Sequence, residues 1–215
     1  FIVKMKQLLS INVAAIIHHD DWAGSVGKTG IDKRPKLGRV ALENDGVEGD
    51  AVLDTKNHGG KDQAVYAYAR EDADWWEKEI GLEIANGRFG ENLTTSGVDV
   101  TNAIVGEIWK IGTTTLQVTM PRIPCKVFEG FWQRPNLIKE FTQAKRPGAY
   151  LRILEEGYVS ASEKIEILEI PTHGITIKDL FAAKSGERTK IKLINEIPGL
   201  APKFKDWATK IASGI

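Results

Sequence analysis

The segment PRIPCKVF contains the one cysteine in 215 residues, Cys125. A thiolate is a nucleophile and a soft ligand for thiophilic metals, whereas a protonated thiol is neither. Arg122 and Lys126 are cationic neighbours that would lower the thiol pKa if their side chains point toward it, and Pro121 and Pro124 restrict the backbone before it. The alternative is a small apolar residue that fills space in a core, because free cysteine is among the most buried residue types. The segment by itself leaves both interpretations open.

A histidine followed by two glycines is the second candidate for a site: His58, Gly59 and Gly60. Adjacent glycines expose backbone N–H groups and can form a concavity that binds an anion, with the imidazole as a further donor. The alternative is an ordinary glycine turn. By contrast, His18 and His19 are not predicted to bind a metal together, because adjacent residues of a strand point to opposite faces.

The segment RFGEN and an arginine before a Pro-Gly turn are the third and fourth candidates: Phe89, Gly90, Glu91, Asn92 and Arg146. Glycine permits close approach of a ligand to the backbone, and a carboxylate with an amide can recognise a hydrogen-bonding heterocycle. Arginine is suited to bidentate phosphate binding. The alternatives are a loop held by side-chain-to-backbone bonds and a solvated surface arginine.

Composition restricts the function classes. Lys plus Arg and Asp plus Glu number 29 each, so the net charge is zero, and the basic excess typical of proteins that bind nucleic-acid polymers is missing. No run of about 18 apolar residues could span a bilayer. The apolar N-terminal stretch contains Ser10 and Asn12 and lacks a small-residue cleavage site, so a first strand is predicted there instead of a signal peptide. A single cysteine cannot form an internal disulfide, and a reducing cytoplasm is the expected compartment.

Short strands alternate with glycine-rich turns over most of the chain. Strands are predicted at 9–17, 64–69, 107–112, 114–120, 148–157 and 162–170, with a hairpin at 40–50. Helical segments are predicted at 70–80, 125–132 and 135–141. Residues 22–38 and 86–97 are predicted to be loops without elements of their own.

The sequence pattern changes after Pro171. Three short amphipathic segments follow, at 175–186, 188–199 and 202–214; Thr176 and Asp179 have capping-box spacing, and Pro202 occupies a first helical position. The predicted fold is mainly β: a β-barrel with short peripheral helices, followed by a small three-helix domain. The predicted domain boundaries are 1–170 and 171–215.

Five motifs in register carry a family resemblance. HGGKDQAVYAYA, a Trp-containing helix, GRFGENLTTSGVDV, VGEIWKIGTTTLQVTMPRIPC and RPGAYLRILEEG together resemble the MOSC family, named for the C-terminal domain of the molybdenum cofactor sulfurase. The similarity extends from about residue 9 to 170, and the tail resembles the three-helix extension of one bacterial branch. The resemblance implies a barrel that binds molybdopterin. It further implies that Cys125 is the ligand to molybdenum and that Arg122 faces the phosphate or pterin.

The remaining motifs take their expected roles from the same resemblance. His58 to Gly60 and Phe89 to Asn92 are expected to border the cofactor cleft, and Arg146 lies in the matched RPGAY segment. The implied activity is a molybdenum-dependent reduction of small N-hydroxylated compounds, such as nucleobases or hydroxylamines, to amines. A flavoprotein or small redox protein would supply the electrons, and the family also suggests pyridoxal phosphate binding and a role in detoxification. The alternative is a sulfur or cofactor carrier with a persulfide on Cys125, without turnover.

Overall fold

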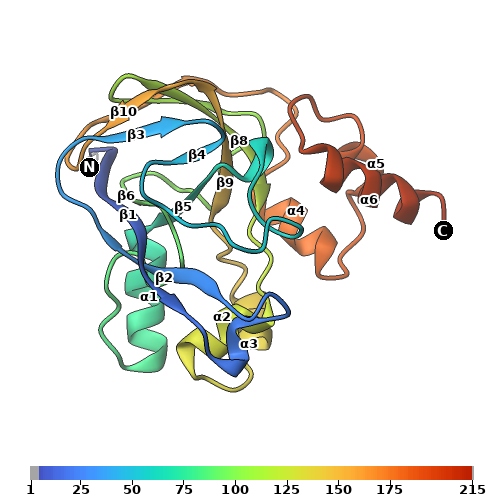
Figure 1. Ribbon diagram of the computed structural model, residues 1–215. Coiled ribbons are helices and arrows are strands. Elements are labelled where there is room, and N and C mark those ends of the chain that lie inside the picture. Colours follow the sequence, from blue (N-terminus) through green and yellow to red (C-terminus); the bar gives the residue numbers. More distant parts are fainter. Residues whose placement is uncertain (1–4, 215) are drawn as a thin grey trace.

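Most strands of the protein belong to one mixed sheet, seen in Figure 1 of a computed structural model that describes residues 5–214. The strand order in this sheet is β11-β7-β8-β9-β5-β6-β1-β2. The strands are β1 (Gln7–His18), β2 (Thr29–Pro35), β5 (Val65–Ala69), β6 (Leu93–Ser96), β7 (Ile108–Ile111), β8 (Thr114–Pro121), β9 (Ala149–Glu155) and β11 (Ile165–Glu169). Neighbouring strands are antiparallel except β5 and β6. A small sheet of β10 (Gly157–Val159), β3 (Val40–Glu43) and β4 (Gly46–Val47) completes the β structure.

The predicted β-rich class is confirmed, but a closed barrel is not established. β11 and β2 are the end strands of the hydrogen-bonded order. Main-chain bonds do connect the start of β1 to the segment before β11: Leu8 N donates to Glu163 O at 2.9 Å, and Ser162 N donates to Leu8 O at 2.7 Å. β1 then separates from this neighbour, because its second half pairs with β2 instead.

Two segments predicted to be loops contain strands, so those predictions were wrong. β2 lies within 22–38 and pairs with β1, with His18 opposite Thr29 and Asn12 opposite Pro35. β6 lies within 86–97, fully buried between β5 and β1. Glycines and charged residues hide the first strand from a propensity argument, and the threonines of the second are short and polar. Pairing partners distant in sequence override both signals.

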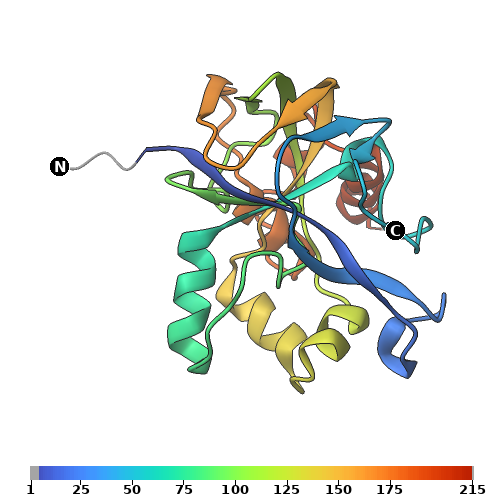
Figure 2. The ribbon, with the colours of Figure 1, turned by 60° about the vertical axis from the view of Figure 1, so that its left-hand side comes forward.

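Three helices cover one side of the sheet: α1 (Arg70–Ile80), α2 (Lys126–Trp132) and α3 (Leu137–Ala144) (Figure 2). α1 follows β5 directly and ends at Gly81, which has a φ of 68°. That left-handed conformation is the usual helix stop and favours glycine. Beneath these helices the aromatic side chains form one buried cluster: Tyr66, Tyr68, Trp76, Phe89, Phe128, Phe141 and Phe181. Two short 3-10 turns lie outside these helices: η1 (Asp21–Ala23) follows β1, and η2 (Lys61–Gln63) precedes β5.

The C-terminal part forms α4 (Ile177–Lys184), α5 (Ile191–Ile194) and α6 (Pro202–Ala212). The predicted capping box at the start of α4 is confirmed, and α6 begins at its proline. Buried residues of all three helices belong to the same apolar cluster as the sheet, for example Leu180, Ile194 and Phe204. The division at residue 170 stays a prediction, and its outer ends, 1–4 and 215, lie outside the described residues. Over the described chain, no helix has the length and apolarity needed to cross a bilayer.

Candidate functional site

A cleft opens beside the turn that joins β8 to α2, with about 810 Å³ of space including the part open to solvent. Its walls come from β2, the segment 51–59, β5 and the β8–α2 turn. Cys125 is the last residue before α2, in extended conformation, and its half-buried side chain lines this cleft. A core-filling cysteine would be sealed, so the structure favours the accessible thiol over the space-filling alternative.

The surroundings of Cys125 favour the thiolate. Burial raises the pKa of the thiol. The hydrogen bond with His58, the charge of Arg122 and the N–H of Phe128 together lower the pKa by more than burial raises it, so the net pKa falls from 9.0 to about 7. A thiol with this pKa is substantially ionised at neutral pH. Lys126, the other expected cation, instead pairs with Glu129 at 2.5 Å, and its side chain is 83% exposed. That part of the sequence prediction was wrong, because the side chain turns along the surface of α2.

Arg122 is a buried cation without a carboxylate partner among the described residues. The residue is 5% exposed, its Nη1 has no hydrogen-bond partner among residues 5–214, and it forms no ion pair with any of them. Its guanidinium instead lies 4.0 Å from the ring centroid of Phe128 and 5.7 Å from that of Phe141. Burying a charge without a partner is costly. The position is therefore suited to an anionic group bound in the cleft, which Arg122 also lines.

The His-Gly-Gly segment is divided between wall and support. His58 and Gly59 line the cleft, whereas Gly60, the residue before η2, does not. Gly59 has a φ of 78°, and a Cβ there would lie 3.1 Å from a methyl of Val52. Behind the turn, Arg152 Nε donates to Asp62 of η2 at 2.8 Å. The carbonyl of Asp62 accepts from Thr119 Oγ1 on β8 at 2.6 Å, which fixes the turn to the sheet.

The Phe-Gly-Glu-Asn segment is also divided. Phe89, Gly90 and Asn92 line the cleft, and the Phe89 ring stacks on Tyr68 with centroids 4.2 Å apart. Glu91 is buried and points away from the cleft. Its carboxylate accepts from the N–H of Gly87 at 2.6 Å and that of Phe89 at 3.0 Å, so the loop is held by side-chain-to-backbone bonds. The expectation that Glu91 borders the cleft is therefore wrong.

Asn92 has its side chain fully used inside the protein. It accepts from the N–H of Tyr66 at 3.1 Å and donates to the carbonyl of Asn12 at 3.2 Å and to Asp50 at 2.8 Å. Asp50 also pairs with Lys33 of β2. Burial raises the pKa of Asp50, but Lys33 and Asn92 lower it by more, so the net pKa is below its usual value. Asn92 thus joins β1 and Asp50 to β5 and lines the cleft without a free polar group.

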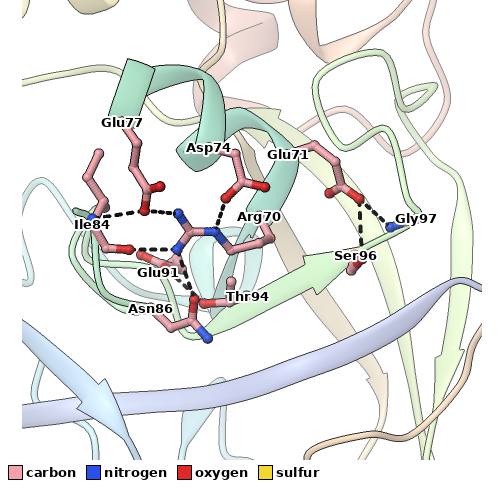
Figure 3. A network of polar contacts seen from close by, with 10 residues as sticks. All are labelled: Arg70, Glu71, Asp74, Glu77, Ile84, Asn86, Glu91, Thr94, Ser96 and Gly97. Atoms are coloured by element: carbon pink, nitrogen blue, oxygen red, sulfur yellow. Dashed lines mark hydrogen bonds and ion pairs between the residues drawn. The ribbon is translucent and has the colours of Figure 1, made fainter. Parts of the chain in front are cut away.

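A polar network anchors the segment that precedes Gly90 (Figure 3). Arg70, the first residue of α1, donates to the carbonyl of Ile84 at 2.6 Å and to the side chain of Asn86 at 3.3 Å. Glu77, about two turns further along α1, accepts from the N–H of Ile84 at 2.9 Å. Residues 84–86 are therefore fixed to α1, and the loop that supplies Phe89 and Gly90 starts from a rigid point.

Arg146 is placed away from the cleft. Its guanidinium pairs with Asp72 of α1 and lies 4.7 Å from the ring centroid of Trp75. Both Arg146 and Asp72 line a second cleft, between the start of α1 and the segment 97–102. Arg146 therefore does not line the cleft that contains Cys125, and its predicted part in binding the cofactor stays a prediction. Tyr68 Oη donates to the Arg146 carbonyl at 3.0 Å.

Sequence reasoning missed the contribution of the β1–β2 arm. Lys28, Thr29, Gly30, Ile31 and Lys33 all line the cleft and face the wall that carries His58. The sequence offered only a weak signal for this strand, a pair of β-branched residues among glycines and charges. Two tyrosines were also missed: Tyr66 from β5 and Tyr150 from β9 line the cleft and supply aromatic surface beside the thiol.

Comparison with known proteins identifies the family. The model of the MOSC domain matches residues 54–166. The uncharacterized protein YflK of Bacillus subtilis is 34% identical over 87% of this chain and 85% of its own length. The crystal structure of YiiM from Geobacillus stearothermophilus superimposes with a TM-score of 0.79 at 29% identity, covering 95% of this chain and 98% of that one. A protein of Gibberella moniliformis named Reductase is 31% identical over 66% of this chain, and the matched part is 26% of the length of that fungal protein. The chain belongs to the MOSC domain family.

Proposed function

We propose that the protein binds the molybdenum cofactor through Cys125 and Arg122 and reduces N-hydroxylated compounds to amines. Membership of the MOSC family supports a relation to the molybdenum cofactor. The fungal relative named Reductase supports a redox activity. The observation that carries the proposal is that an ionisable thiol and an unpartnered buried guanidinium line the same cleft.

The residues of the cleft fit such a cofactor. A thiolate is a suitable protein ligand for molybdenum, and because Cys125 supplies one ligand only, the cofactor would bring the others. The cofactor carries a phosphate, and the orphaned Nη1 of Arg122 is suited to bind it. Gly59 and Gly90 both have a φ of 78°, and added Cβ atoms would crowd Val52 and Ile31. The cleft walls therefore stay open where a side chain would fill them.

The chain's own residues would bind and orient the cofactor and enclose it in the cleft. His58 holds the sulfur of Cys125 by a hydrogen bond and supports the thiolate. Tyr66, Phe89 and Tyr150 provide flat apolar surface that suits planar rings. When bound, the cofactor supplies the two-electron chemistry that removes the hydroxyl oxygen of the substrate. The balance R–NHOH + 2 e⁻ + 2 H⁺ → R–NH₂ + H₂O requires an external electron donor, for which we propose a flavoprotein or small redox protein.

The test uses protein purified from a host that makes the cofactor. Molybdenum is measured by mass spectrometry of the metal, and pterin by fluorescence after oxidation. We expect both molybdenum and pterin in the native protein. Cys125→Ala should contain no molybdenum, and Arg122→Gln should contain less pterin than the native protein. Arg146→Gln is the matched control, because it removes an arginine that lies outside the cleft. Reduction of hydroxylaminopurine by native protein and Cys125→Ala at equal rates would remove Cys125 from the mechanism.

The same thiol supports a second candidate function, transfer of sulfur from a Cys125 persulfide. The lowered pKa of the accessible thiol favours this candidate too, because persulfide formation requires a thiolate. Mass spectrometry under non-reducing conditions separates the two functions. A mass increase of about one sulfur atom on Cys125 in protein free of molybdenum would favour the carrier.

A further inference from the structure

Positive charge gathers at the C-terminal end of the protein. The whole chain carries 29 basic and 29 acidic residues, but residues 184–214 contain seven basic and three acidic ones, an excess of four positive charges. All seven basic side chains belong to exposed residues: Lys184, Arg188, Lys190, Lys192, Lys203, Lys205 and Lys210. The remainder of the chain carries the balancing excess of four acidic residues, so the neutral total conceals a local basic excess.

Most of these charges are available to a partner. Within the described part of the chain, Lys190 is the one member with an ion pair, to Asp179 at 2.8 Å. Lys184 lies 4.1 Å from the ring centroid of Trp207. We define the basic face as these seven basic side chains together with Leu193; they come from the end of α4, the segment between α4 and α5, and α5 and α6. Figure 1 shows α5 and α6 standing at one side of the molecule, beyond α4, which leaves their outer surfaces uncovered.

The basic face has the composition of a protein-binding surface. Leu193 of α5 is 56% exposed and directly follows Lys192, so an apolar side chain lies among the cations. Protein interfaces combine apolar contact with a charged rim, whereas a phosphate backbone offers little to an exposed leucine. These features favour an acidic protein over a nucleic acid.

The basic face is connected to the inner wall of the cleft. Phe181 of α4 lies one turn before Lys184, and its ring is 6.2 Å from that of Phe141. Phe141 is in turn 5.2 Å from Phe128, against which Arg122 packs. A continuous run of packed aromatic side chains therefore links α4, at the edge of the basic face, to the cleft residue Arg122.

We propose that the basic face is the docking surface for the electron donor, an acidic protein that carries a flavin mononucleotide. This inference rests on the proposed function, which requires two electrons from outside the chain. Complementary charge would steer the donor to this side and orient it before contact. The apolar spot at Leu193 would then hold the complex after the charges have aligned it.

The test measures binding of an oxidised flavodoxin to the cofactor-free protein by calorimetry, in low and in physiological salt. The variant is Lys192→Glu/Lys203→Glu/Lys205→Glu, and Lys192→Ser/Lys203→Ser/Lys205→Ser is a milder second form. The matched control, Lys78→Glu/Lys139→Glu/Lys164→Glu, changes the net charge by the same amount on exposed residues elsewhere. Circular dichroism confirms that each variant is folded.

We expect the charge-reversed variant to bind at least about tenfold more weakly and the control to stay within about threefold, with native binding weakened by salt. Equal loss in variant and control, or no measurable binding by the native protein, overturns the proposal. Binding of a DNA duplex that the reversal abolishes, without binding of flavodoxin, also overturns it. Because neither measurement requires cofactor or turnover, failure here is distinct from failure of the proposed function, which the molybdenum content decides.

Discussion

The pKa of Cys125 leads to a quantitative prediction for the cofactor-free protein. With a pKa of about 7, about half of the thiol is ionised at pH 7, against about 1% for a thiol at 9.0. A thiolate whose pKa is about 7 is itself less nucleophilic than one whose pKa is 9.0, by about eightfold over these two pKa units for a Brønsted slope of ~0.4–0.5. Alkylation by iodoacetamide at pH 7 should then be about five- to tenfold faster than that of an ordinary exposed thiol. Its rate should rise with pH to a plateau, with a midpoint near 7.

The variant His58→Ala tests the cause. It removes the hydrogen bond to the sulfur, so the midpoint of the alkylation profile should move upward from 7 toward 9. His19→Ala is the matched control, since His19 is exposed on the β1–β2 arm, and the profile should not change. Cys125 is the sole cysteine, so the label reports on one site. A midpoint near 9 in the native protein, or the same midpoint in His58→Ala, would refute the reasoning.

The same shift has a consequence for stability. The folded state lowers the pKa of an acid, so the ionised form stabilises folding, fully above the unfolded value of 9.0 and not at all below about 7. Two pKa units correspond to about 2–3 kcal/mol. Stability of the native protein relative to Cys125→Ser should therefore increase between pH 7 and 9. Urea unfolding at several pH values measures this difference, and a flat difference would contradict it.

Three further predictions concern the loop that supplies one wall of the cleft. Gly87→Ala should cost about 2–4 kcal/mol, because its φ is 90° and the new Cβ would collide with the carbonyl of Lys33; Gly81→Ala, in open space, should cost about 1 kcal/mol in the same urea titration. Glu91→Ala should cost about 2–4 kcal/mol by leaving two N–H groups unpaired. Burial raises the pKa of Glu91, so the stability of the native protein relative to Glu91→Gln should fall as the pH rises above 4.5, and a difference that does not change with pH would contradict the raised pKa. Arg70→Ala should free the segment after α1, seen as faster amide exchange at residue 84 and beyond with unchanged exchange in β8.

Local patterns were sufficient for elements whose determinants are close in sequence. The helix that starts at Arg70 was predictable from its acidic first turn and its terminal glycine, and the capping box at Thr176 from two side chains three residues apart. The β-rich class followed from short runs separated by turns. β2 and β6 were not predictable, because their stability comes from strands far away in sequence and not from their own composition.

The sequence by itself determined which residues have the chemistry: one thiol, a pair of glycines after a histidine, and arginines near prolines. The tertiary structure alone decided which of them meet. It placed Cys125, His58 and Arg122 along one cleft, turned Glu91 inward to hold its own loop, and paired Arg146 with Asp72 on another side. Residue type sets what a side chain can do, but distance, burial and available partners depend on contacts between distant segments. Those contacts arise from the packing of the whole chain.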